Sequence, residues 1–149
     1  MKTIKYFLLL NLGVFLLCFS NCGEETPEPT QKEIKTGYLI NKSNGWVLKS
    51  ITVPINSATT EDQWVNFKLT VSLSTMSTSG HPSGANVVWP TGGWTMDDNG
   101  NTITRADGVV MSVLTLTATN FRVSFTVPEG TDIGGRIAAL DGDYVFDLE

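Results

Sequence analysis

The sequence predicts an all-β protein, a single antiparallel β-barrel of about seven or eight strands, with a two-sheet β-sandwich as the second choice. In residues 93–127, β-branched and aromatic runs alternate with turns rich in Asp, Asn and Gly, which is the strongest short-range signal for β-hairpins. In residues 64–73, apolar and polar residues alternate strictly, as in a strand with one buried and one solvated face. Thr and Val also recur throughout the chain, while helix-forming runs are scarce.

The N-terminal half of the domain is expected to contain strands separated by one long loop. Residues 46–53 are rich in apolar and β-branched side chains and predict a strand. The short apolar run at residues 38–40 is either a first strand or a lead-in to it. Residues 74–90 form the longest irregular segment, and loops of more than about 12–15 residues are often functional. We expect this loop to fold back so that Trp89 covers one end of the core.

The C-terminal half is expected to be a meander that ends in a long strand. The predicted strands of the meander are residues 94–97, 102–106, 109–117 and 121–127. The last strand, residues 136–148, has apolar side chains at every second position, and Gly142 allows a bend or bulge within it. We expect it to pair with residues 46–53 and close the sheet.

The N-terminus has the three parts of a secretory signal, predicted at residues 1–21. Residues 1–5 carry two lysines, and residues 6–17 are almost uninterruptedly apolar. An uncleaved membrane helix is the alternative. The apolar run is short for it, because a bilayer core requires roughly 20 apolar residues.

Residues 19–23, with the sequence Phe-Ser-Asn-Cys-Gly, resemble the lipobox of bacterial lipoproteins, in which cleavage leaves an N-terminal cysteine that carries acyl chains. Ser20 and Gly23 fit that pattern, whereas the residues at positions −3 and −1 depart from it. Cys18 is the competing site, but two bulky leucines precede it. The resemblance therefore implies that Cys22 is the lipid-attachment residue and that the membrane is a partner through more than one acyl chain, as stable anchoring requires.

Residues 22–36 are predicted to be the lipidated cysteine followed by a flexible tether, and residues 37–149 the barrel domain. Residues 24–35 are almost all polar, and Pro27 and Pro29 favour an extended conformation. The acidic pair that follows Cys22 resembles the surface-export signal of lipoproteins from the Bacteroidota. That resemblance implies an outer-membrane lipoprotein of the bacterial cell envelope, exposed at the cell surface.

The order of short motifs along the domain carries a wider resemblance. These motifs lie at residues 45–46, 64–70, 88–94, 104–108, 121–125 and 142–146. Together they resemble lipoproteins of the Bacteroidota and, more loosely, their small lipocalin-like β-domains. The resemblance implies a small β-barrel lipoprotein and no particular activity. The chain lacks the Gly-x-Trp of lipocalins near a longer first strand with a supporting disulfide.

Composition limits the classes of partner. The chain has 149 residues, enough for one domain of ordinary size. Its formal net charge is −5, and cleavage before Cys22 would remove two lysines and take it to −7. A domain this acidic has no electrostatic footprint for phosphate backbones, so nucleic acid is excluded as a partner.

Residues that carry chemistry are few, so the chain is predicted not to be an enzyme and to hold no metal or cofactor. His81 is the single histidine, and no cysteine lies beyond the N-terminal pair. Residues 97–101 have oxygen ligands at alternate positions, but the glycine and glutamate of a calcium loop are missing, so we expect an Asx-rich hairpin turn. Solvated charges are expected at Asp141, Asp143 and Asp147.

Four tryptophans offer either a ligand surface or core packing, and Trp89 and Trp94 are the candidate ligand-binding residues. The leading hypothesis is a non-enzymatic, membrane-anchored lipoprotein that binds a small apolar or glycan ligand in its barrel. The alternative is a structural or accessory subunit of a cell-envelope complex with a filled barrel.

Overall fold

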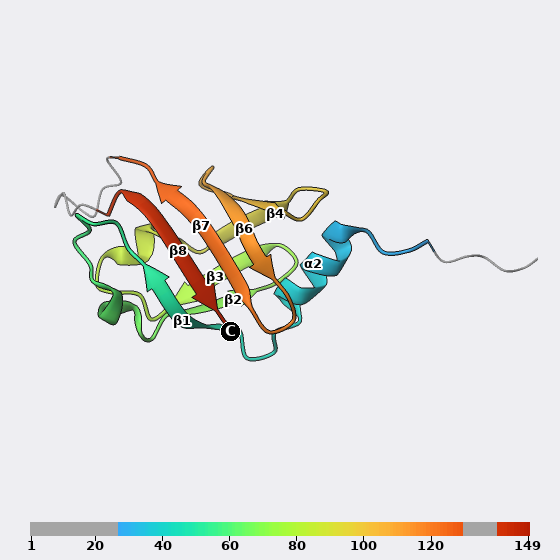
Figure 1. Ribbon diagram of the computed structural model, residues 1–149, viewed down its shortest axis with the longest axis horizontal. Helices are drawn as coiled ribbons and strands as arrows, with labels where there is room; N and C mark the ends of the chain where they lie inside the picture. Colours follow the sequence, from blue (N-terminus) through green and yellow to red (C-terminus); the bar gives the residue numbers. More distant parts are fainter. Residues whose placement is uncertain (1–26, 130–139) are drawn as a thin grey trace, which may run out of the picture.

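Eight strands close into one antiparallel β-barrel in the computed structural model, which describes residues 27–129 and 140–149 (Figure 1). Each strand pairs with its neighbours in sequence, and the last strand pairs with the first. The predicted barrel is therefore confirmed, rather than the sandwich. The strands are β1 (Trp46–Thr52), β2 (Lys68–Val71), β3 (Thr75–Ser79), β4 (Gly92–Met96), β5 (Thr102–Arg105), β6 (Val110–Leu116), β7 (Phe121–Val127) and β8 (Gly142–Leu148).

Closure of the barrel depends on the pairing of β1 with β8 that the sequence predicted. Thr52 lies opposite Val145 and Leu48 lies opposite Leu148, with a register shift between Leu48 and Ser50. On β8, alternate side chains from Tyr144 to Leu148 are buried. The strand begins at Gly142, whose φ of +116° marks the predicted bend. Residues 136–139 of the predicted strand lie outside the described residues.

The β4–β5 connection is the predicted Asx-rich turn. The Asp97 carboxylate accepts the backbone N–H groups of Asn101 and Thr102, each at 2.7 Å. Gly100 has a φ of +67°, and a Cβ at this position would meet the Lys35 side chain at 2.4 Å. Only glycine fits here without strain. The close packing of the Lys35 side chain on this turn therefore depends on Gly100.

The strand predicted at residues 64–73 is wrong in its first half. Residues Glu61–Trp64 form a short 3₁₀ helix, η1, and the strand begins only at Lys68. Thr60 and Gln63 make a capping box that starts the helix. Trp64 is buried by this turn, whereas Val65 and Leu73, which were expected on the buried face, are 67% and 77% exposed.

The long irregular segment predicted at residues 74–90 contains β3 and a second 3₁₀ helix, η2 (Ala85–Val87). Along β3 only Met76 is buried, and the other side chains are Thr and Ser. The strand pairs with β2 from Met76 to Ser79. A strand with one inward apolar residue has no visible period in sequence, which explains why it was not predicted.

The tether predicted through residue 36 is wrong from Gln31 onward, because Gln31–Ile40 form the helix α2. This helix also replaces the strand considered at residues 38–40. A capping box starts it: the Glu33 backbone N–H donates to Thr30 Oγ1 at 3.2 Å, and the Thr30 backbone N–H donates to the Glu33 carboxylate at 2.7 Å. Leu39 is the fully buried residue of the helix.

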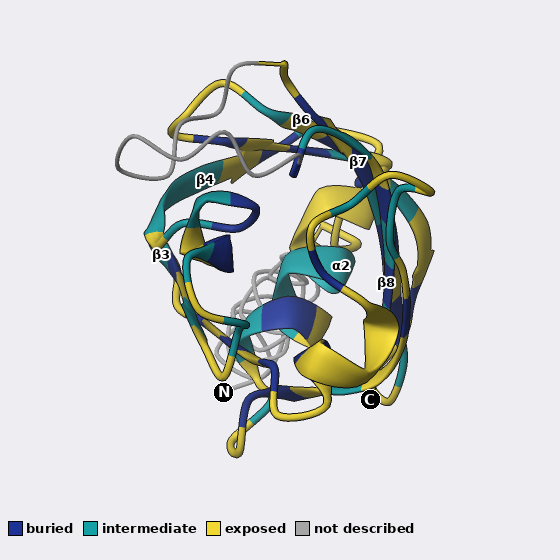
Figure 2. Ribbon diagram, turned by 90° about the vertical axis from the view of Figure 1, so that its left-hand side faces the viewer, coloured by how far each residue is buried: buried dark blue, intermediate teal, exposed yellow. Residues whose placement is uncertain are grey.

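The two ends of the barrel are occupied by different elements. At one end, here called the helix end, α2 lies beside the β4–β5 turn (Figure 1). At the opposite end lie η1 and η2 (Figure 1), and this is here called the pocket end. A view into the barrel shows buried segments around the ring, with α2 across the opening behind it (Figure 2). An aromatic cluster fills the interior between the ends, formed by Trp64, Phe67, Trp89, Phe125, Tyr144 and Phe146.

Candidate functional site

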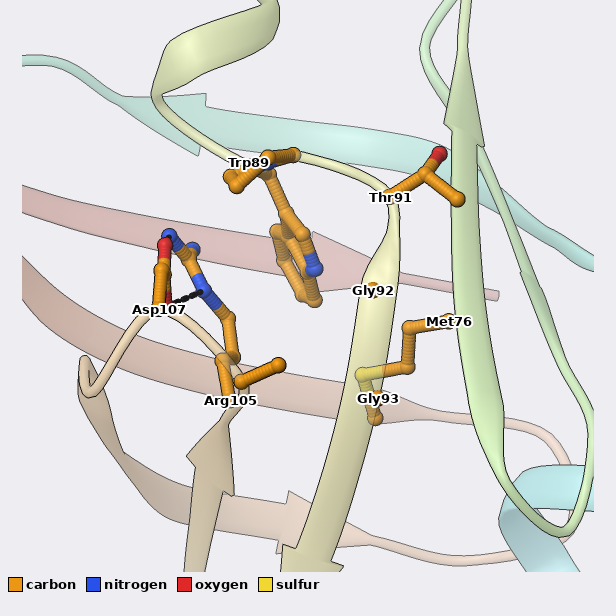
Figure 3. Close-up of a pocket in the computed structure, with 9 residues that line it drawn as sticks. Met76, Trp89, Thr91, Gly92, Gly93, Arg105 and Asp107 are labelled. Carbon is orange, nitrogen blue, oxygen red and sulfur yellow. Dashed lines mark hydrogen bonds and ion pairs between the residues drawn. The ribbon is translucent and has the colours of Figure 1, made fainter.

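A pocket of about 300 Å³ opens in the barrel wall at the pocket end, beside Trp89 (Figure 3). It lies where β3, β4 and the end of β5 meet, and two consecutive glycines of β4, Gly92 and Gly93, contribute no side chain to fill it. A Cβ at Gly92 would lie 3.5 Å from the Ala106 Cβ, at ordinary contact distance. The lining is completed by Met76, Pro90, Thr91, Arg105, Ala106 and Asp107.

The faces of the Trp89 ring are used by the core. Its centroid lies 5.8 Å from that of Phe67, 5.4 Å from that of Phe125 and 5.2 Å from that of Phe146. The residue is only 1% exposed. The predicted position of Trp89 in the core at one end of the barrel is therefore confirmed, and the ring presents no free face for stacking.

The Trp89 Nε1–H is buried and has no hydrogen-bond partner among the residues that the structure describes. Its nitrogen lies on the side of the ring that faces β4 at Gly92 (Figure 3). The indole N–H groups of the other three tryptophans all have acceptors: Leu39 O for Trp46, Thr59 Oγ1 for Trp64 and Ser72 O for Trp94. A buried donor without an acceptor costs about 1–3 kcal/mol, so this one requires an explanation.

Arg105 and Asp107 form an ion pair at the edge of the pocket (Figure 3). The Arg105 Nε donates to Asp107 Oδ1 at 3.1 Å, and Nη2 donates to Oδ2. Nη1 donates to the Val88 carbonyl at 2.8 Å, and the guanidinium lies over the Phe125 ring at 5.1 Å. Only 4% of the arginine side chain is exposed, against 33% of the aspartate.

The contacts of Arg105 with Asp107 keep the aspartate in its charged form. Partial burial by itself would raise the pKa of the Asp107 carboxyl. The hydrogen bonds and positive charge of Arg105, together with the backbone N–H of Val109, outweigh that effect and hold the pKa below its usual value. The Asp107 carboxylate is therefore ionised at neutral pH and offsets the charge of the guanidinium, so that the pair presents little net charge to the pocket.

Trp94 lies apart from this pocket. Its ring is partly buried and packs against the core, and its indole N–H donates to Ser72 O at 3.0 Å. It lines a separate depression of about 210 Å³ with Lys32, Thr36, Leu73, Thr95 and Met96. Trp89 and Trp94, the pair selected from the sequence, therefore do not share one site.

Sequence reasoning missed Arg105, although the strand period carried a signal. Arg105 and Ile103 are two residues apart on β5, and both are buried. An arginine in phase with a buried isoleucine is therefore directed inward. The acceptors that this requires, Asp107 in the following turn and Val88 before β4, depend on the tertiary fold.

Other residues considered from the sequence lie elsewhere. Cys22 lies outside the described residues. His81 is half-buried after β3, and no cluster of three or more potential metal ligands occurs within residues 27–129 and 140–149. The Asp143 carboxylate accepts a hydrogen bond from Thr126 Oγ1 at 2.5 Å, and that of Asp147 accepts one from Asn120 Nδ2 at 2.7 Å.

Comparison with protein-family models, curated proteins and solved structures gave no match to this chain. In the part of the chain that the structure describes, none of the helices combines the length and apolar character needed to cross a bilayer.

Proposed function

We propose that this chain is a membrane-anchored, non-enzymatic lipoprotein whose barrel domain binds a small, uncharged ligand in the pocket beside Trp89. The observation that carries the proposal is the buried Trp89 N–H at the edge of a pocket of about 300 Å³, which lacks an acceptor in the described part of the chain. Small-molecule sites are typically concave and largely apolar, with a few polar groups that fix the ligand. The walls formed by Met76, Pro90 and Ala106 fit that description.

The filled interior directs the proposal to the barrel wall rather than to a lipocalin-like lumen. Phe146 is fully buried and lies at the centre of the aromatic cluster, with the Phe67 ring centroid 4.9 Å away and that of Trp89 5.2 Å away. Side chains packed at this spacing occupy the volume that a ligand in the lumen would need. The ligand is therefore proposed to approach at the rim of the barrel, beside the start of β4 and the end of β5.

Ligand binding is tested by titrating small uncharged molecules, sugars among them, into the full-length protein and following backbone amide signals by NMR. Binding in the pocket should shift the amides of Gly92, Gly93 and Ala106, and leave those around Trp94 unchanged. The variant Gly92→Leu, which fills the pocket, should abolish the shifts, while Thr95→Leu on the same strand should not. Shifts confined to the Trp94 depression would contradict the proposed site.

The membrane anchor is tested separately. It rests on the similarity of residues 19–23 to a lipobox and on the apolar run before them. Cys22→Ala should abolish incorporation of labelled fatty acid and release the protein from the membrane fraction, whereas Cys18→Ala should leave both unchanged. Labelling that is lost only in Cys18→Ala would move the attachment to that residue.

An accessory role in an envelope complex is the second candidate, and the filled barrel interior supports it. Apolar side chains also remain exposed on the surface: Val47, Ile55, Val65 and Leu73 are 46%, 101%, 67% and 77% exposed. Crosslinking in intact cells, with the crosslinker placed at Ile55 or Val65, should recover one partner in fixed stoichiometry. Recovery of the monomer alone from both positions would reject this role.

A further inference from the structure

The Trp89 side chain is buried, and the feature of it that calls for a partner is the Nε1–H in the wall of the pocket. The faces of its ring pack against Phe67, Phe125 and Phe146, so an aromatic or sugar ring has no platform on which to stack. The N–H edge, in contrast, is turned toward Gly92 and has no acceptor among the described residues (Figure 3). Because an indole N–H only donates, its partner must be an acceptor atom.

The surroundings of the donor favour an uncharged acceptor. The Arg105 charge is already balanced by Asp107, which binds it through both carboxylate oxygens. An anionic ligand would lose hydration without meeting a free cation here, and it would approach the Asp107 carboxylate. A carbonyl oxygen meets the N–H without these costs.

The remaining walls favour a small apolar group next to that oxygen. Met76 is buried and lines the pocket, and Pro90 and Ala106 contribute further carbon atoms. The absence of side chains at Gly92 and Gly93 leaves space beside the N–H for a group of methyl size. A carbonyl whose carbon bears a methyl group is an acetyl group. Among uncharged acetyl groups the acetamido group has the strongest acceptor, because an amide oxygen carries more negative charge than that of an ester or a ketone.

Resting on the proposed ligand-binding function, we infer that the pocket recognises an acetamido group, as carried by N-acetylated sugars, through a hydrogen bond from Trp89 Nε1–H to the acetamido carbonyl. The methyl group then lies against Met76 and Ala106. Specificity comes from the buried donor, because a ligand without a carbonyl at this position leaves the donor unpaired.

The test uses the ¹⁵N-labelled full-length chain, in which each of the four tryptophans gives its own indole N–H signal. The Trp89 signal is assigned by its loss in Trp89→Phe. N-Acetylglucosamine and N-methylacetamide should both shift this signal, whereas glucose, which lacks the acetamido group, and acetate, which is charged, should not. N-Methylacetamide separates recognition of the group itself from recognition of the sugar that carries it.

Affinity measurements on matched variants complete the test. Trp89→Phe should weaken binding of N-acetylglucosamine by about fivefold, the equivalent of one hydrogen bond of about 1 kcal/mol. Trp94→Phe, which removes an indole N–H that already has an acceptor, should leave the affinity unchanged. Equal weakening by both variants would overturn the inference, as would equal shifts of the Trp89 signal by glucose.

Two negative outcomes separate the inference from the function on which it rests. If a sugar shifts the amides of Gly92 and Ala106 but not the Trp89 indole, the pocket binds ligand without this donor, and the acetamido inference alone is overturned. If no small molecule shifts any of these signals, the ligand-binding function is overturned with it.

Discussion

Among the described residues, the buried indole N–H at the helix end of the barrel has an acceptor, whereas the one beside the pocket has none. Trp46 Nε1 donates to the Leu39 carbonyl at 3.0 Å, and Lys35 Nζ lies 3.1 Å from Gly100 O and 3.0 Å from Asn101 Oδ1. Trp89, as deeply buried as Trp46, has no such acceptor among the described residues. One tryptophan stabilises the fold through its N–H, and the other retains its N–H at a cost.

This difference is the reason why the proposed ligand site is placed at the pocket end. Buried polar groups in proteins are nearly always paired, so an exception beside a pocket calls for a partner that arrives from outside. The free-energy cost of leaving the Trp89 N–H unpaired has to be offset by favourable packing in other parts of the core. The aromatic cluster next to the pocket provides such packing.

The largest effect is expected from Phe146→Ala. The Phe146 ring contacts five other aromatic rings, with centroid distances of 4.9–6.3 Å. Deleting it should lower the free energy of unfolding by about 3–5 kcal/mol, through lost burial and the cavity that remains. Chemical denaturation measures this, with the exposed Leu114→Ala as control at about 0.5 kcal/mol or less. A loss below about 1 kcal/mol would mean that the cluster is loosely packed.

The comparison of the two ends is tested directly by paired tryptophan variants. Trp46→Phe and Trp89→Phe remove similar volumes from the core, but only the first leaves a buried carbonyl, that of Leu39, without its donor. We therefore expect Trp46→Phe to be the more destabilising by about 1–3 kcal/mol. Equal losses in urea denaturation would show that the Trp89 N–H is satisfied in solution.

The ion pair at the pocket edge gives a pH-dependent prediction. Asp107→Asn leaves the buried guanidinium of Arg105 without its counter-charge and should cost about 1–2 kcal/mol at neutral pH, less than for a fully buried pair because Asp107 is partly exposed. The pKa of Asp107 is lower in the folded than in the unfolded protein. Its contribution is therefore complete well above the unfolded pKa of about 3.9 and is lost as pH falls through the folded pKa.

Urea denaturation of both proteins over a range of pH measures this dependence. The difference in stability between wild type and Asp107→Asn should be constant from pH 7 to about 5.5 and shrink below about pH 4. A difference that grows on acidification would contradict the assigned pKa shift. Asp98→Asn serves as the control, because its ion pair with Lys32 is largely exposed.

A strand could be predicted from the sequence where buried and exposed residues alternate along it. β7 buries alternate residues over its whole length, and β8 does so from Tyr144 to Leu148. Their period was therefore visible in the sequence, and the pairing of β8 with β1 was expected. β3 buries only Met76, and residues 64–67 continue an alternating pattern while forming a turn. At this turn the capping box of Thr60 and Gln63 favours a 3₁₀ helix over the strand that the alternating residues predict.

The candidate site was predictable in part for similar reasons. Trp89 was selected because it is a large aromatic residue in a long loop, but whether its N–H finds an acceptor depends on the packing of η2 against the barrel. Trp94 looked equivalent in sequence and differs only because Ser72, on a neighbouring segment, accepts its N–H. The helix α2 had a visible capping box at Thr30 and Glu33, yet the proline-rich context before it favoured a tether.

The smallest effect, and the one that isolates the helix end, is expected from Thr30→Ala. Thr30 Oγ1 accepts the Glu33 backbone N–H, and the box that they form begins the helix whose Leu39 carbonyl accepts the Trp46 indole N–H. Loss of this cap should destabilise α2 by about 1 kcal/mol, seen as faster hydrogen exchange of its backbone amides and of the Trp46 indole N–H. Ligand binding beside Trp89 should be unchanged. If Thr30→Ala weakened that binding as well, the two ends would be coupled through the barrel, and the division between a stabilising end and a binding end would be wrong.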